Sequence, residues 1–85
     1  MATLLIWTDD GTTLTIIDSH QVEDGDQATI DELFEDAAER DGADSGCAFD
    51  VDRHSDAVQR TYEEYARPFG LALVDAVEGH EPTTY

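Results

Sequence analysis

The stretch "TLLIWTDDGTTLTIID", residues Thr3–Asp18, predicts a β-hairpin. Its first part, Thr3–Thr8, is rich in β-branched and aromatic residues and is apolar on both faces, which is typical of a strand. Asp10-Gly11 then gives a tight-turn signal, because Gly adopts the positive φ that such a turn needs. Residues 12–18 alternate Thr with Leu and Ile, and this alternation predicts the returning strand.

A polar loop follows, and residues 30–41, "IDELFEDAAERD", then predict a helix. Its apolar residues recur at the spacing of one helical face: they are Ile30, Leu33, Phe34, Ala37 and Ala38. Thr29 and Glu32 form the pattern of a capping box at the start of this helix. Gly42 comes just after Arg40, and a glycine at this place favours the end of a helix.

The second half of the chain predicts a short strand, a second helix and a buried strand. Residues 47–51 alternate, with apolar side chains on one side. A helix capped by Asp52 or Ser55 is expected to run to about Arg67. Its apolar stripe consists of Val58, Tyr62, Tyr65, Ala66 and Phe69. The run "LALVDAV", residues 71–77, is nearly all apolar, which is typical of a strand that is covered on both faces.

The predicted order β-β-α-(β)-α-β indicates an α/β (α+β) two-layer sandwich. We expect a small mixed β-sheet with an N-terminal hairpin and two amphipathic helices on one face. If residues 47–51 pair into the sheet, the second helix would connect them to the last strand as a right-handed parallel crossover. The length of 85 residues allows one core. Residues 1–78 are therefore predicted to form a single domain, and residues 79–85 a flexible tail.

The chain is strongly acidic, with a formal net charge of -17 from 21 acids and four Arg. A small soluble domain usually carries a net charge of roughly 2–8 in magnitude. In the first predicted helix, acids repeat at i,i+4, which destabilises a helix in dilute salt. Concentrated salt would screen this repulsion. The lysine-free, Asp-rich composition resembles that of proteins from extreme halophiles, notably halophilic archaea, and this resemblance implies no activity.

The charge also restricts the classes of partner and the location. Four scattered Arg in a negative field argue against direct binding to nucleic acid, which needs clustered basic residues. An anionic membrane surface would repel the chain for the same reason. No apolar run approaches the roughly 18 residues of a membrane span, and the N-terminal residues lack the basic region of a secretory signal. A cytoplasmic location is therefore expected. Cys47 is the single cysteine, which excludes a disulfide within the chain.

The best metal-site candidate lies in "FDVDRHSD", residues 49–56, where Asp50, Asp52, His54 and Asp56 are spaced two apart. Carboxylates with an imidazole could hold Mn²⁺, Mg²⁺ or Zn²⁺. The alternative interpretation is that Asp52 caps the second helix and that Asp50 faces solvent. With acids at about a quarter of all positions, such spacings also arise by chance, and no cofactor is expected.

No catalytic residue is assigned from the sequence. Cys47 with His54 or His20 is a conceivable nucleophile pair, but Cys47 is expected on the apolar side of its strand, where a buried role is usual. Asp75 interrupts the last apolar run. This aspartate could be a functional acid, or it could mark an exposed strand end and pair with Arg67.

An interaction surface is predicted from the first strand. Leu5 and Trp7 share one face of it. If both helices cover the other face, then Leu5, Trp7 and Asp75 would form an exposed patch, and such patches usually bind a partner. The alternative interpretation is that Trp7 belongs to the core or its rim.

These observations lead to three hypotheses for function. The first is a small cytoplasmic protein of a halophile that acts by protein–protein interaction or self-association, for example as a homodimer, and not as an enzyme. The second is a nucleic-acid mimic that inhibits a basic DNA- or RNA-binding protein through its acids. The third is a small metal-binding protein or enzyme that uses residues 50–56.

Overall fold

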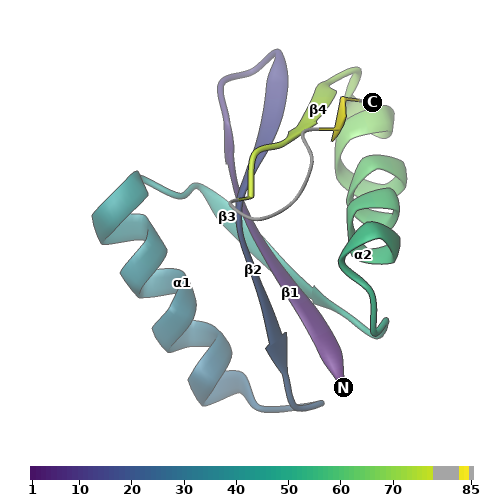
Figure 1. The fold of residues 1–85 in the computed structure, drawn as a ribbon. Coiled ribbons are helices and arrows are strands. Elements are labelled where there is room, and N and C mark those ends of the chain that lie inside the picture. The colour runs from purple at the N-terminus through teal and green to yellow at the C-terminus, as the bar shows by residue number, and fades with distance from the viewer. Residues whose placement is uncertain (78–82, 85) are drawn as a thin grey trace.

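The predicted hairpin lies at the centre of the sheet. The computed structural model describes residues 1–77 and 83–84, and Figure 1 shows its arrangement. The elements in chain order are β1 (Ala2–Asp9), β2 (Thr13–Val22), α1 (Gln27–Asp41), β3 (Ser45–Phe49), α2 (His54–Thr61), the π-helical turn η1 (Tyr62–Ala66), the 3₁₀ turn η2 (Arg67–Phe69), β4 (Ala72–Asp75) and β5 (Thr83–Thr84). The strand order across the sheet is β3-β1-β2-β4-β5.

The turn between β1 and β2 follows from the side chain of Asp10. Its carboxylate accepts hydrogen bonds from the backbone N–H groups of Thr12, at 2.9 Å, and Thr13, at 2.7 Å. These bonds favour the charged form and lower the pKa of Asp10. Gly11 has a φ of 90°, which other residues rarely adopt. The hairpin prediction is therefore confirmed.

The sheet is mixed because of how the other strands join the hairpin. β3 pairs with β1 in antiparallel fashion, and β4 pairs with β2 in parallel fashion. Since β2 also runs antiparallel to β1, β2, β3 and β4 all point the same way. The strand predicted at residues 47–51 exists but spans Ser45–Phe49. As predicted, α2 connects it to the parallel strand β4, although β1 and β2 lie between the two.

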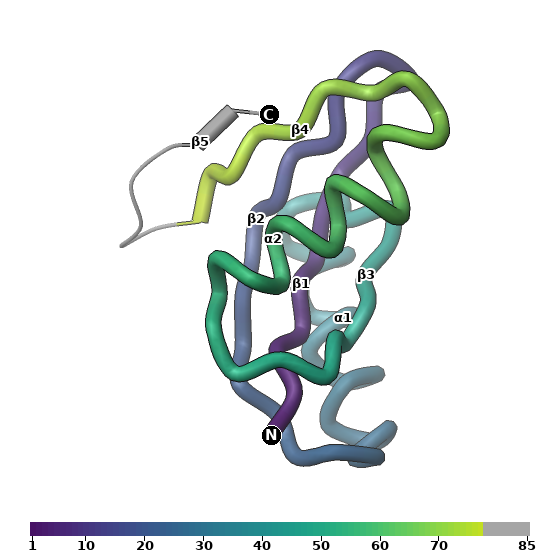
Figure 2. The backbone as a smooth tube through the Cα atoms, turned by 90° about the vertical axis from the view of Figure 1, so that its right-hand side faces the viewer, coloured from purple at the N-terminus to yellow at the C-terminus, as the bar shows by residue number. Residues whose placement is uncertain are grey.

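The two helices lie on opposite faces of the sheet. Figure 2 shows α2 in front of the strands and α1 behind them. The α+β class and the mixed sheet with its hairpin are confirmed, but the prediction that both helices cover one face is wrong. The connection β2-α1-β3 crosses the sheet in one direction, and β3-α2-β4 crosses back. Two such crossovers have the same hand only if their helices lie on opposite faces, and parallel crossovers are nearly always right-handed.

Each helix covers its own cluster of apolar residues. The α1 face holds Leu4, Ile6 and Val22 from the sheet, packed against Ile30, Leu33, Phe34 and Ala37. The α2 face holds Leu5, Trp7, Leu14, Ile16 and Leu73, packed against Ala57, Val58 and Ala66. Leu5 is 0% and Trp7 3% exposed. The prediction that Leu5 and Trp7 form an outward surface is therefore wrong, because α2 covers the face that was expected to be open.

The helix boundaries differ from the predictions at their N-terminal ends. Asp26, not Thr29, caps α1, and its carboxylate accepts bonds from the backbone N–H and the hydroxyl of Thr29. Gly42 ends α1 in the left-handed conformation, as expected. The N-cap of α2 is Arg53, with no side-chain capping bond, so the predicted caps Asp52 and Ser55 are wrong.

Two further predictions concern the C-terminal tail and membrane-spanning segments. The predicted tail, residues 79–85, lies outside the described residues except for Thr83 and Thr84, which form β5 beside β4. Within the described part of the chain, no helix combines the length and the apolar character that crossing a membrane requires.

Candidate functional site

A β-bulge decides which side chains of β2 face α2. Ile6 pairs with Asp18 but Trp7 pairs with Ile16, so Ile17 is an extra residue in β2. Strand residues alternate between the two faces. Without the extra residue, Asp18 would share the α2 face with Ile16. With it, Ser19 pairs with Leu5 and faces α2. Bulges that re-aim a side chain in this way are common next to functional sites.

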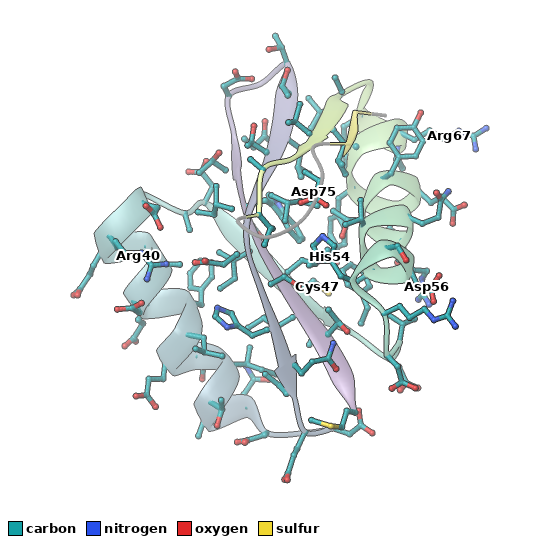
Figure 3. The ribbon with its side chains drawn as sticks, viewed as in Figure 1. Arg40, Cys47, His54, Asp56, Arg67 and Asp75 are labelled. Atoms are coloured by element: carbon teal, nitrogen blue, oxygen red, sulfur yellow. The ribbon has the colours of Figure 1, made fainter. Side chains whose placement is uncertain are left out.

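Ser19 faces the imidazole of His54. Its Oγ lies 2.8 Å from His54 Nδ1. The other ring nitrogen, Nε2, lies 2.6 Å from Oδ2 of Asp75. The side chain of His54 is 13% exposed and that of Asp75 is 5% exposed. Three residues from β2, the start of α2 and the end of β4 therefore form a Ser–His–Asp hydrogen-bonded array, called here the Ser19 array. Figure 3 shows His54 and Asp75 next to one another between the sheet and α2.

The loop before α2 is held in place by bonds to the hairpin. The hydroxyl of Thr3 donates to the carbonyl of Val51 at 2.8 Å. The side-chain amide of Gln21 donates to Thr3 Oγ1 at 2.9 Å and to the carbonyl of Asp52 at 3.1 Å. Gln21 lies two residues after Ser19 on the same strand and the same face. These bonds therefore set the position of His54 relative to Ser19.

The partners of His54 determine its tautomer. An ionised carboxylate only accepts hydrogen bonds, so in the neutral imidazole the proton lies on Nε2 and is donated to Asp75. Nδ1 then carries a lone pair, and the hydroxyl of Ser19 donates to it. The second oxygen of Asp75, Oδ1, accepts the backbone N–H of Val77 at 3.2 Å. A histidine held in this way can act as a general base towards a hydroxyl, although the two ring nitrogens are exchanged relative to the usual Ser–His–Asp triad, in which Nε2 faces the serine.

Ser19 also lines a cavity of about 620 Å³ at the edge of the sheet. β4 pairs with β2 only as far as Ile16, so the later part of β2 is free of β4 and the cavity lies beside it. The lining residues are Ile17, Asp18, Ser19, Arg40, Asp41, Ala76 and Val77. The cavity is large enough for a small-molecule ligand, since such sites measure roughly 300–1,000 Å³.

Arg40 forms the α1 side of this cavity and is surrounded by acids. Its guanidinium contacts Asp18 at 2.6 Å, Asp41 at 2.8 Å and Asp36 at 3.0 Å. The hydrogen bond to Asp41 and the charges of the neighbouring carboxylates raise the pKa of Arg40. The charge of Arg40 is therefore constant and more than balanced by the carboxylates around it.

The predicted metal ligands are not brought together. Asp50, Asp52 and Asp56 are exposed, and Asp52 lies 3.8 Å from the N-terminal amine. His54 points the other way, into the Ser19 array, while Asp56 points outward (Figure 3). Among residues 1–77, no three His, Cys, Asp or Glu side chains are grouped as a metal would need. The alternating positions 50–56 span a loop and the first turn of α2, so their side chains diverge.

Cys47 and Asp75 also differ from their predicted pairings. Cys47 accepts a hydrogen bond from the hydroxyl of Tyr65 at 3.5 Å and contacts neither His20 nor His54 in the described bonds. This hydrogen bond is the main cause that raises the pKa of Tyr65. Asp75 is buried and pairs with His54, so the predicted exposed strand end and the pairing with Arg67 are wrong. The interpretation of Asp75 as a functional acid stays a prediction.

Ser19 was missed because nothing in its local sequence marks it. It follows the predicted end of the second strand, in "SHQVEDG", and β2 in fact continues to Val22. The face of Ser19 follows only from the β-bulge, because the extra residue Ile17 shifts the alternation of the residues that come after it. Comparison of the chain with protein-family models, with curated protein sequences and with solved structures finds no match in any of the three.

Proposed function

We propose that the protein is a serine hydrolase of small esters, with Ser19 as the nucleophile, His54 as the general base and Asp75 as the residue that orients His54. The observation that carries this proposal is the continuous hydrogen-bonded array from Ser19 Oγ through both ring nitrogens of His54 to Asp75. A serine hydroxyl is a weak nucleophile unless a base accepts its proton. Here the base is in hydrogen-bonding distance, and Ser19 is one of the residues that line a cavity.

The chemistry follows from the roles of these atoms. As Ser19 Oγ attacks the ester carbonyl carbon, its proton passes to His54 Nδ1. The bond from that carbon to the alcohol oxygen then breaks, and His54 returns the proton to the leaving alkoxide. His54 next removes a proton from water, which attacks the acyl group on Ser19. The carboxylic acid leaves and Ser19 regains its proton. Asp75 stabilises the imidazolium that forms in each half of the cycle.

The first test is covalent labelling of Ser19 by a fluorophosphonate, in about 2 M KCl to screen the acidic surface. We expect attack of Oγ on phosphorus with loss of fluoride, seen as a single added phosphonyl group in the intact mass and located on Ser19 by peptide mapping. Ser19→Ala should remain unlabelled. Ser55→Ala, which removes an exposed hydroxyl next to His54, is the matched control and should label like the unmodified protein. Absence of labelling, or equal labelling of Ser19→Ala, would overturn the proposal.

A second candidate function is self-association, supported by Phe69. This side chain is 72% exposed, and it adjoins a cavity of about 430 Å³ that is lined by Trp7, Asp9, Gly11, Leu14, Ser45, Tyr65, Phe69 and Leu71. A projecting ring beside a hollow suits a twofold interface, in which each copy fills the cavity of the other. Asp9 is the one charged residue in this lining, and the carboxylate of Asp44 accepts its backbone N–H at 2.8 Å, so association at this place needs salt to screen these acids.

Phe69→Ser tests this second candidate. In about 2 M KCl, where charge repulsion is screened, we expect the unmodified protein to form a dimer and Phe69→Ser to be a monomer of unchanged stability. Sedimentation equilibrium gives both masses. Gln59→Ser, on the exposed side of α2, is the control and should dimerise normally. A protein that stays monomeric at millimolar concentration would contradict self-association.

A further inference from the structure

The acids around the cavity point to the class of substrate. Resting on the proposed function, we propose that the Ser19 site takes esters that carry a positive charge, such as a quaternary ammonium group, in preference to neutral esters of the same shape. Two of the seven residues that line the cavity are acids, Asp18 and Asp41. Asp18 is adjacent in sequence to Ser19, and its side chain is only 21% exposed.

Arg40 does not reverse the sign of this site. It is the single base in the lining, and it contacts three carboxylates, those of Asp18, Asp36 and Asp41. The lining therefore holds one positive and two negative charges, and Asp36 adds a third carboxylate beside Arg40. The whole chain adds to this field with a net charge of -17. A cavity in a low-dielectric wall concentrates such a field and raises the local concentration of ions of opposite sign.

The arrangement also explains why an anionic substrate is disfavoured. A carboxylate or phosphate that entered the cavity would have to compete with three fixed carboxylates for the N–H groups of Arg40. Three of its five N–H groups already donate to Asp18, Asp36 and Asp41. A cation, in contrast, would be attracted by Asp18 and Asp41, which line the same cavity as Ser19, although Asp18 pairs with Ile6 on the α1 face and Ser19 with Leu5 on the α2 face. The geometry therefore favours a substrate with its charge at one end and its ester bond at the other.

The experiment compares two fluorophosphonates that differ in one group: one carries a trimethylammonium and the other a tert-butyl group of the same size. The readout is the second-order rate of Ser19 labelling. We expect the cationic probe to react about three- to tenfold faster, which corresponds to roughly 0.7–1.4 kcal/mol. The preference should fall as KCl is raised, because salt screens the carboxylates.

Matched variants separate the local field from the net charge. Asp18→Asn and Asp41→Asn should each lose a large part of the preference for the cationic probe. Asp56→Asn removes the same charge at an exposed position of α2 that is not part of the cavity lining, and it should keep the preference. Equal labelling by both probes, or an equal loss in all three variants, would overturn the inference and leave the nucleophile assigned. If neither probe labels Ser19, the proposed function itself fails.

Discussion

Asp75→Asn is expected to lower the rate of Ser19 labelling by about 10²–10⁴-fold, the usual contribution of a general base. The asparagine has the same shape as the aspartate but carries an amide N–H₂ that can donate to His54 Nε2. The ring proton would then lie on Nδ1 and face Ser19, where it leaves no lone pair to accept the hydroxyl proton. The measurement is the rate of fluorophosphonate labelling, followed by intact mass.

A purely structural role of Asp75 would give a different result. Asp75 is buried and pairs with His54, so its replacement could also weaken the fold, and the thermal midpoint must be measured beside the rate. We expect a rate loss far larger than any change in the folded fraction. Asp56→Asn, an exposed substitution of the same kind, should change neither quantity. If Asp75→Asn labels as fast as the unmodified protein, Asp75 does not orient the base.

Folding itself is expected to depend on salt. On α1 the acids Asp31, Glu32, Glu35, Asp36 and Glu39 are all exposed. They form three like-charge i,i+4 pairs, each costing about 0.2–0.5 kcal/mol in dilute salt. Arg40 offsets this repulsion only in the last turn of α1, where it pairs with Asp36 and Asp41. Because domains are stable by only about 5–15 kcal/mol, the local pairs together with the repulsion of a -17 chain should destabilise the fold at low ionic strength.

Circular dichroism across a KCl series measures this dependence. At about 1 M salt the Debye length is near 3 Å, so we expect helix content to be low in dilute buffer and to recover cooperatively as salt rises. A neutral solute at the same osmolality is the control and should restore much less helix. Helix content that does not respond to salt would mean that the repulsion is offset within the fold. Adaptation to salt would then not explain the acidic surface, and imitation of a nucleic acid would be the first alternative explanation to test.

The sequence by itself determined the local elements. Alternation and the Asp10-Gly11 turn predicted the hairpin, and helical spacing predicted α1 and α2. These signals are local, since they depend on residues within a few positions of one another. The same reasoning failed at the N-terminal caps, where Thr29 was predicted but Asp26 makes the capping bonds.

The tertiary structure alone decided the faces of the sheet and the site. Leu5 and Trp7 became core residues because the two crossovers run in opposite directions and place a helix on each face. Ser19 faces His54 because one extra residue, Ile17, changes the alternation of β2. His54 and Asp75 meet because α2 returns the chain to β4. Each of these outcomes depends on pairing between segments far apart in the chain, and the periodicity of a single segment carries no information about such pairing.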